Sequence, residues 1–153
     1  MPYLITMLLA ALTDLILKSG IEEMPDQSFP RTMTGTREKL QIRKVHNAGF
    51  PMGVLKERPE VVRLLPLAAS SALLMRFSLL LPRKGRILSK LGMSLTLGGS
   101  VSNLFDRFFR GYVVDYLFVD AKGLNKIVFN LGDLCIALGG ALTAAGAGGR
   151  KSR

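Results

Sequence analysis

The chain has no tryptophan, one cysteine and one histidine among its 153 residues. A lone Cys135 excludes an internal disulfide framework, and together with a lone His46 it argues against a zinc site. Acidic residues are also few, since 11 Asp and Glu stand against 21 Lys and Arg. The net charge of +10 would suit nucleic acid, but the few aromatic residues are not interleaved with basic ones as a base-stacking surface requires. We therefore expect no metal site and no nucleic-acid partner.

The apolar residues, 48% of the chain, gather in four long blocks with charged residues between them. The blocks cover residues 3–19, 62–82, 87–106 and 127–147 approximately, each close to the ~20 residues that cross a bilayer core. The last block is rich in Gly and Ala, which allow close helix packing in membranes. The pattern predicts a single domain, residues 1–153, that is an all-α integral membrane protein with four transmembrane helices.

The short loops predict the orientation of these helices. Basic clusters occupy residues 83–86 and 150–153, and the positive-inside rule places both in the cytoplasm. Both termini are then cytoplasmic, and the segments of about residues 20–61 and 107–126 lie outside. Within the first of these, the run KLQIRKV alternates in polarity, which predicts a short strand between the first two helices.

Several ionisable or amide side chains fall inside or at the ends of the blocks, where an ionisable group is costly unless it is paired or functional. Asp14 and Lys18 are four residues apart, so they share a helix face and can pair. In the expected topology the whole set lies toward the outer face: Asp14, Lys18, Asn103, Asp106, Arg107, Asn130 and Asp133.

Asp115 lies in the outer segment, within the run GYVVDYLFV. Its apolar neighbours suggest that this segment dips against the helices, where Asp115 could meet Asp133 in a partly dry setting. Two carboxyl groups about 3 Å apart share one proton. The charged member can act as a base toward water while the protonated member polarises a carbonyl, so the pair fits aspartic peptidase chemistry.

Four ordered motifs resemble those of the bacterial lipoprotein signal peptidases (signal peptidase II). Residues 98–119, GGSVSNLFDRFFRGYVVDYLFV, resemble the family's GG-x-x-GN-x-x-DR-x-x-x-G-x-VVDF signature. Residues 129–133, FNLGD, resemble FN-x-AD, and residues 46–49, HNAG, resemble N-x-G. Asp14 and Lys18 match the family's D-Q-x-x-K, with Leu15 in place of Gln.

The resemblance implies an aspartic endopeptidase that removes signal peptides from prolipoproteins, cutting N-terminal to a diacylglyceryl-modified Cys. Asp115 and Asp133 would be the catalytic pair. Asn47, Gly49, Asn103, Arg107 and Asn130 would shape the site and bind substrate, with Asp14, Lys18 and Asp106 as structural support. The resemblance implies no metal or cofactor. It further implies a monomer in contact with lipids of the bacterial cytoplasmic membrane, with its active site near the outer leaflet.

Alternatives remain beside this interpretation. The chain departs from the family pattern at Ser102, Gly132 and Phe50–Gly53, which leaves open a degenerate member that binds lipidated peptides without cutting them. Asp115 could be a solvated loop aspartate, and Asp133 could pair with Lys126 or Arg107. The amides could simply join helices through hydrogen bonds.

Overall fold

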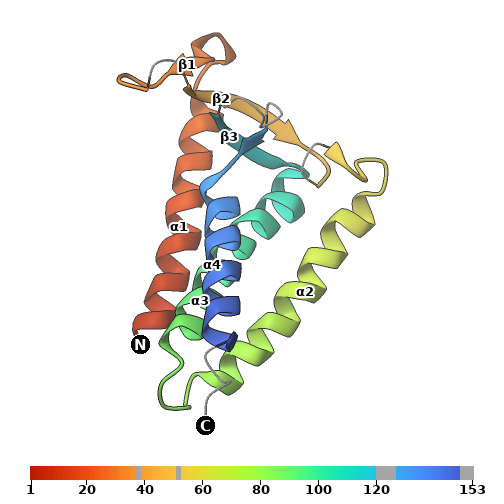
Figure 1. The fold of residues 1–153 in the computed structure, drawn as a ribbon. Coiled ribbons are helices and arrows are strands. Elements are labelled where there is room, and N and C mark those ends of the chain that lie inside the picture. The colour runs from red at the N-terminus through yellow and green to blue at the C-terminus, as the bar shows by residue number, and fades with distance from the viewer. Residues whose placement is uncertain (37–38, 51–52, 120–126, 149–153) are drawn as a thin grey trace.

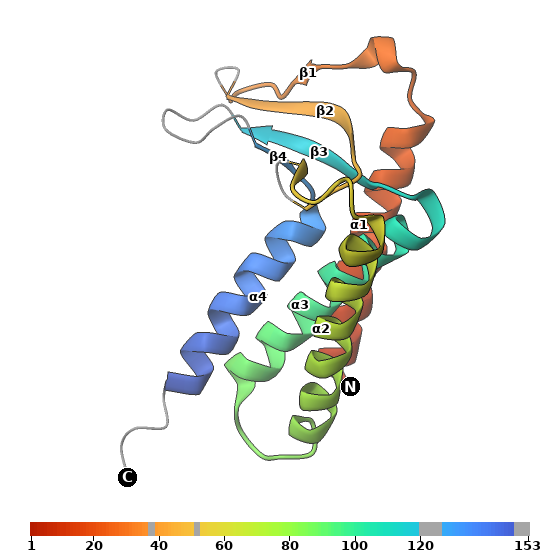
Figure 2. The same ribbon diagram turned by 90° about the vertical axis from the view of Figure 1, so that its right-hand side faces the viewer.

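Four helices stand on one side of a small sheet (Figure 1). The computed structural model describes residues 1–36, 39–50, 53–119 and 127–148. The helices are α1 (Pro2–Glu23), α2 (Pro59–Leu80), α3 (Ile87–Phe105) and α4 (Leu131–Gly148). The first residue and the α2–α3 link lie at the end of the bundle opposite the sheet, as both ribbon views show (Figures 1 and 2).

The sheet joins the two segments that were expected outside the membrane. It is antiparallel, in the order β1 (Arg31–Thr32), β2 (Leu40–Asn47), β3 (Val113–Val119) and β4 (Val128–Phe129). The pairing of β2 with β3 sets Val45 opposite Asp115 and has an irregularity between Ile42 and Val45. The sheet therefore brings the segment before α2 onto the strand that carries Asp115.

Helix α3 is the centre of the bundle and contacts α1, α2 and α4. Small residues allow the close contacts: a Cβ on Gly98 would lie 2.6 Å from the carbonyl oxygen of Met7 in α1, and one on Gly99 would collide with the carbonyl of Gly132 in α4. Close approach of backbones through glycine is the usual way that helices pack tightly in a membrane.

Helices α1, α2 and α4 are each long and apolar enough to cross a membrane, by length and composition. They expose large apolar side chains such as Ile16 and Met75, which are 70% and 67% exposed. Among the described residues α3 does not join this group, since its buried face carries Ser89, Lys90 and Ser94. The four predicted spans thus correspond to four helices, of which three have the properties of a membrane span.

Three details of the prediction were wrong. The fold is not all-α, because the second outer segment also forms a strand, β3, although this strand does pack against the helices as expected for the segment of Asp115. The last helix begins at Leu131 and not at 127, because Val128 pairs with Phe118 in the sheet. Helix α2 begins earlier than expected, at Pro59, a residue favoured at the first position of a helix. The strand expected at KLQIRKV is confirmed as part of β2.

A π-helical turn, η3 (Asp106–Arg110), follows α3, and a short 3-10 turn, η1 (Asp26–Ser28), follows α1. Gly111 ends η3 with a φ of 86°, a left-handed conformation that glycine adopts without a steric penalty. The turn therefore reverses the chain directly from α3 into β3.

Candidate active site

A buried ionic network joins α1 to the end of α3. The Lys18 ammonium lies 2.9 Å from Asp14 and 3.1 Å from Asp106, and all three side chains are fully buried. It also donates to the Ser102 hydroxyl at 3.1 Å and to Asn103 Oδ1 at 2.7 Å. Buried charges are tolerated when they are paired and hydrogen-bonded, so this network satisfies each group. The pairing of Asp14 with Lys18 was expected from their spacing.

Asp14 also fixes the sheet to the helices. Its Oδ2 accepts from the Ser102 hydroxyl at 2.6 Å, and its Oδ1 accepts from the Tyr116 hydroxyl at 2.9 Å. The Tyr116 hydroxyl in turn accepts from the backbone N–H of Leu131 at 3.1 Å. Through these hydrogen bonds α1 holds both β3 and the first residue of α4 in place.

Asp106 fixes the turn between α3 and β3. Its Oδ1 accepts from Arg110 Nη1 at 2.7 Å, and its Oδ2 accepts from the backbone N–H of Val114 at 3.0 Å. Asp106 is fully buried, and the two bonds clamp the residues on either side of η3. This geometry agrees with the structural role expected for Asp106, beside Arg107.

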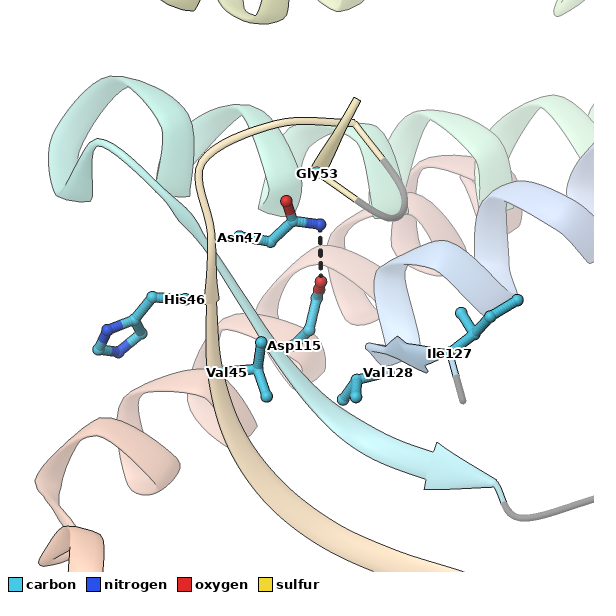
Figure 3. A pocket seen from close by; sticks show the side chains of 7 residues that line it. All are labelled: Val45, His46, Asn47, Gly53, Asp115, Ile127 and Val128. Atoms are coloured by element: carbon cyan, nitrogen blue, oxygen red, sulfur yellow. Dashed lines mark hydrogen bonds between the residues drawn. The ribbon is translucent and has the colours of Figure 1, made fainter. Parts of the chain in front are cut away.

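Asp115 lies in the middle of β3 and is only 4% exposed. Its two oxygens accept from amide groups: Asn47 Nδ2 donates to Oδ2 at 3.1 Å, and Asn130 Nδ2 donates to Oδ1 at 2.8 Å. Figure 3 shows this hydrogen bond between Asn47 and Asp115, which line one pocket together with Val128. The pKa of Asp115 is raised to about 6, chiefly by burial and also by the nearby Asp133, while the hydrogen bonds from Asn47 and Asn130 act to lower it. Asp115 is therefore not a solvated loop aspartate.

Asn47 is itself held by a tight turn. Its Oδ1 accepts from the backbone N–H of Gly49 at 3.0 Å, and Phe50 and Val54 then form an isolated antiparallel bridge. A Cβ at Gly49 would lie 2.6 Å from the Val54 carbonyl oxygen, so this turn has no room for a larger residue. Gly49 thus positions the Asn47 side chain toward Asp115.

Asp133 lies in the first turn of α4, where it forms a reciprocal cap with Asn130. The backbone N–H of Asp133 donates to Asn130 Oδ1 at 2.8 Å, and the backbone N–H of Asn130 donates to Asp133 Oδ2 at 3.3 Å. This cap explains why the helix starts here. Asp133 Oδ1 accepts from Asn103 Nδ2 at 2.8 Å, so Asn103 links Asp133 to Lys18.

Asn130 joins the two aspartates. Its Nδ2 donates to Asp115 while its Oδ1 accepts from the Asp133 backbone. Asp115 and Asp133 also line one pocket of about 290 Å³ together with Asn47, Arg107 and Ile136. The structure therefore brings both predicted carboxylates, from β3 and α4, to the same cavity.

Arg107 lines this pocket and a second one of about 380 Å³, which runs between α2, α3 and α4 and also includes Asp133. The guanidinium lies 5.8 Å from the ring of Phe50, and its buried Nε has no hydrogen-bond partner among the described residues. Burial lowers the pKa of Arg107, while Asp133 and Asp115 oppose that shift. Within the described part of the chain Arg107 forms no ion pair with Asp133; Lys126 lies outside the described residues.

Some site residues were not expected from the sequence. Tyr116 had no special signal, and Ser102 stood out only as a departure from the family pattern, yet both bind Asp14. Glu22 and Tyr112 support the strand of Asn47, because Glu22 accepts from Tyr112 at 3.2 Å and contacts His46 Nε2 at 2.7 Å. Such contacts depend on register and side-chain direction, which spacing alone does not give.

Comparisons with known proteins agree with the geometry. The family model described as Signal peptidase (SPase) II matches residues 6–147. The lipoprotein signal peptidase of Moorella thermoacetica is 34% identical over 141 residues, which are 91% of this chain and 87% of that protein. The lipoprotein signal peptidase of Wigglesworthia glossinidia brevipalpis is 30% identical over 100 residues, 65% of each chain. That of Rickettsia felis is 33% identical over 72% of this chain and 56% of its own length.

In the last two comparisons the chain covers less than two thirds of its relative. Two solved structures of bacterial membrane enzymes share the fold, with TM-scores of 0.79 and 0.76 at 18% identity. Each alignment covers 99% of this chain, and 93% or 94% of the other. Both the family model and the Moorella relative span most of the chain. The chain belongs to the signal peptidase II family.

Proposed function

We propose that this protein is an aspartic endopeptidase that removes signal peptides from diacylglyceryl-modified prolipoproteins, cutting N-terminal to the lipidated Cys. One observation carries the proposal: Asp115 and Asp133 line one pocket and are joined through Asn130. Membership of the signal peptidase II family supports the substrate class.

In the proposed mechanism the two carboxyl groups share one proton. The ionised member takes a proton from a water molecule, which attacks the scissile carbonyl, and the protonated member polarises that carbonyl. The protonated member then donates to the leaving amine. The pKa of about 6 at Asp115 supports this division, since it lets the pair keep a proton nearer neutral pH than a solvated aspartate can.

Arg107 and the apolar pocket support the binding of a peptide. Arg107 lines the same cavity as both aspartates and forms no ion pair among the described residues, so its guanidinium can donate to a substrate carbonyl. The adjoining pocket is lined by residues such as Pro66, Ala69 and Leu73, which suit an apolar segment or an acyl chain.

We propose that the protein works in the bacterial cytoplasmic membrane as a monomer, with all four helices crossing and with the sheet and active site near the outer leaflet. The basic link at residues 83–86, at the end of the bundle opposite the sheet, supports cytoplasmic termini.

The test is a gel-shift cleavage assay of the purified protein in detergent with a diacylglyceryl-modified prolipoprotein. Asp115→Asn or Asp133→Asn should abolish cleavage. The matched control is Asp26→Asn, because that carboxylate is 87% exposed in η1 and pairs only with Lys44 among the described residues; it should cleave normally. Cleavage that persists in either site variant contradicts the mechanism. Binding of the precursor by the unaltered protein without cleavage would favour the non-catalytic alternative.

A further inference from the structure

Carboxylates and basic residues are distributed very unevenly along the chain. Between Glu60 and Asp106 there is no Asp or Glu, and none follows Asp133. The α2–α3 link and the start of α3 carry Arg83, Lys84, Arg86 and Lys90 within that stretch. The end of the bundle opposite the sheet thus concentrates positive charge without an acidic side chain on either helix near it.

Three arginine side chains line one pocket at this end of the bundle. Arg76, Arg83 and Arg86 line a cavity of about 250 Å³ between the end of α2 and the start of α3, together with Leu79, Leu80 and Ser89. None of the ion pairs among the described residues involves these guanidinium groups. Arg76, whose place inside the second apolar block had no evident reason, is one wall of this pocket.

The backbone around the pocket is held in a fixed shape. The Arg83 carbonyl accepts from Lys90 Nζ, and the Arg83 N–H donates to the Leu80 carbonyl at 3.1 Å. Arg86 has a φ of 54°, a left-handed conformation that is rare for a residue with a side chain. The fixed link holds the guanidinium-bearing residues around one cavity before any ligand binds.

The start of α3 adds to the positive field. Arg86 is its N-cap and makes no side-chain capping hydrogen bond, and the first turn contains no acidic residue. The positive end of a 19-residue helix therefore faces the basic link without a negative side chain to balance it. Ser89, in this first turn, brings a hydroxyl group to the pocket.

We propose that this pocket binds the phosphodiester headgroup of an anionic phospholipid. Guanidinium groups match phosphate oxygens in bidentate geometry, and basic pockets between membrane helices on the cytoplasmic side bind such headgroups. A lipid fits better than free phosphate because the pocket borders the apolar surface of α2, where Leu79 and Met75 are 64% and 67% exposed. Acyl chains can lie along that surface. The proposal requires α2 to cross the bilayer and is independent of peptidase activity.

The test measures lipid binding to the purified full chain in detergent by native mass spectrometry. Phosphatidylglycerol is compared with phosphatidylcholine, and thermal unfolding is followed with phosphatidylglycerol or with inorganic phosphate at equal concentration. Arg76→Gln/Arg83→Gln is the site variant, and both side chains are exposed, so the fold should persist. Lys56→Gln/Arg58→Gln is the control, since it removes two exposed charges before α2, at the sheet end.

The unaltered protein should bind phosphatidylglycerol at least about tenfold more tightly than phosphatidylcholine. The site variant should lose about fivefold in affinity for each guanidinium removed, or roughly 25-fold in all, while the control stays within about twofold. Phosphate alone should not raise the unfolding temperature. Equal phosphatidylglycerol affinity in the site variant and the unaltered protein overturns the proposal. Equal stabilisation by phosphate overturns the lipid assignment.

Discussion

The buried carboxylates of this protein fall into two groups with opposite surroundings. Asp14 and Asp106 lie against the Lys18 ammonium, and Arg110 also binds Asp106. Asp115 and Asp133 accept hydrogen bonds from amide groups, and no ion pair among the described residues involves either of them. A lysine neutralises the buried charge of the first pair, whereas the second pair lies among amide groups with no cation in an ion pair with it. This difference is what we expect if the first pair supports the fold and the second pair carries out the proposed cleavage.

The largest expected effect comes from removing the cation that Asp14 and Asp106 share. Lys18→Met leaves Asp14 and Asp106 buried without their shared cation, which should cost about 3–5 kcal/mol of folding free energy. Lys56→Met is the control, because the Lys56 side chain is exposed and no ion pair among the described residues involves it, so its loss should matter far less. Thermal unfolding in detergent measures both, and equal losses would contradict a structural role for Lys18.

The pH dependence of stability tests the surroundings of Asp115 in the second group. Because the pKa of folded Asp115 is raised from 3.8 to about 6, the folded state prefers the protonated form. Its contribution to stability is present below pH 3.8 and is lost as the pH rises to about 6. The stability of the unaltered protein relative to Asp115→Asn should therefore fall by at most about 3 kcal/mol from pH 4 to pH 7.5, at 1.36 kcal/mol per pKa unit. Unfolding of both proteins at the two pH values measures this, and a difference that rises with pH would have the wrong sign.

A smaller effect concerns the residues at 102 and 132, where the chain departs from the family pattern. A Cβ at Gly132 would lie 2.7 Å from Asp14 Oδ2, the same oxygen that accepts from the Ser102 hydroxyl. Gly132→Ala should therefore destabilise the protein by about 1–3 kcal/mol, since overpacking displaces Asp14. Adding Ser102→Gly frees Asp14 to move and should recover part of the loss. Strictly additive unfolding free energies would show that the two positions are independent.

The smallest expected effect is at the turn that positions Asn47. Gly49→Ala should slow cleavage about tenfold and also lower the stability, because its Cβ would lie 2.6 Å from the Val54 carbonyl oxygen and shift the turn. Gly140→Ala is the control, since that glycine is exposed in α4 and a Cβ there would meet nothing within 4 Å. Cleavage kinetics of the two variants test this prediction. An unchanged rate in Gly49→Ala would show that Gly49 does not help to position the site.

Hydrophobic blocks and helix spacing were enough to predict four helices and the Asp14–Lys18 pair. Strand β3 was missed because its run of apolar residues around Asp115 is buried on both sides and so lacks alternation. The start of α4 was misplaced because Val128 and Phe129 are as apolar as the helix, and only the Asn130–Asp133 cap marks the boundary. The convergence of Asp115 with Asp133 could be stated from the sequence only as a hypothesis. The contact of Asn47 with Asp115 depends on the pairing of β2 with β3, and the sequence pattern does not specify that pairing.

The most direct test of joint action by the two aspartates is a double-mutant cycle on cleavage of a diacylglyceryl-modified prolipoprotein. Residues that act as one unit lose activity together, so Asp115→Asn, Asp133→Asn and the double variant should all fall to the same background rate. All three should remain folded in detergent. Measurable cleavage by both single variants, with losses that multiply in the double variant, would show that the carboxylates act independently.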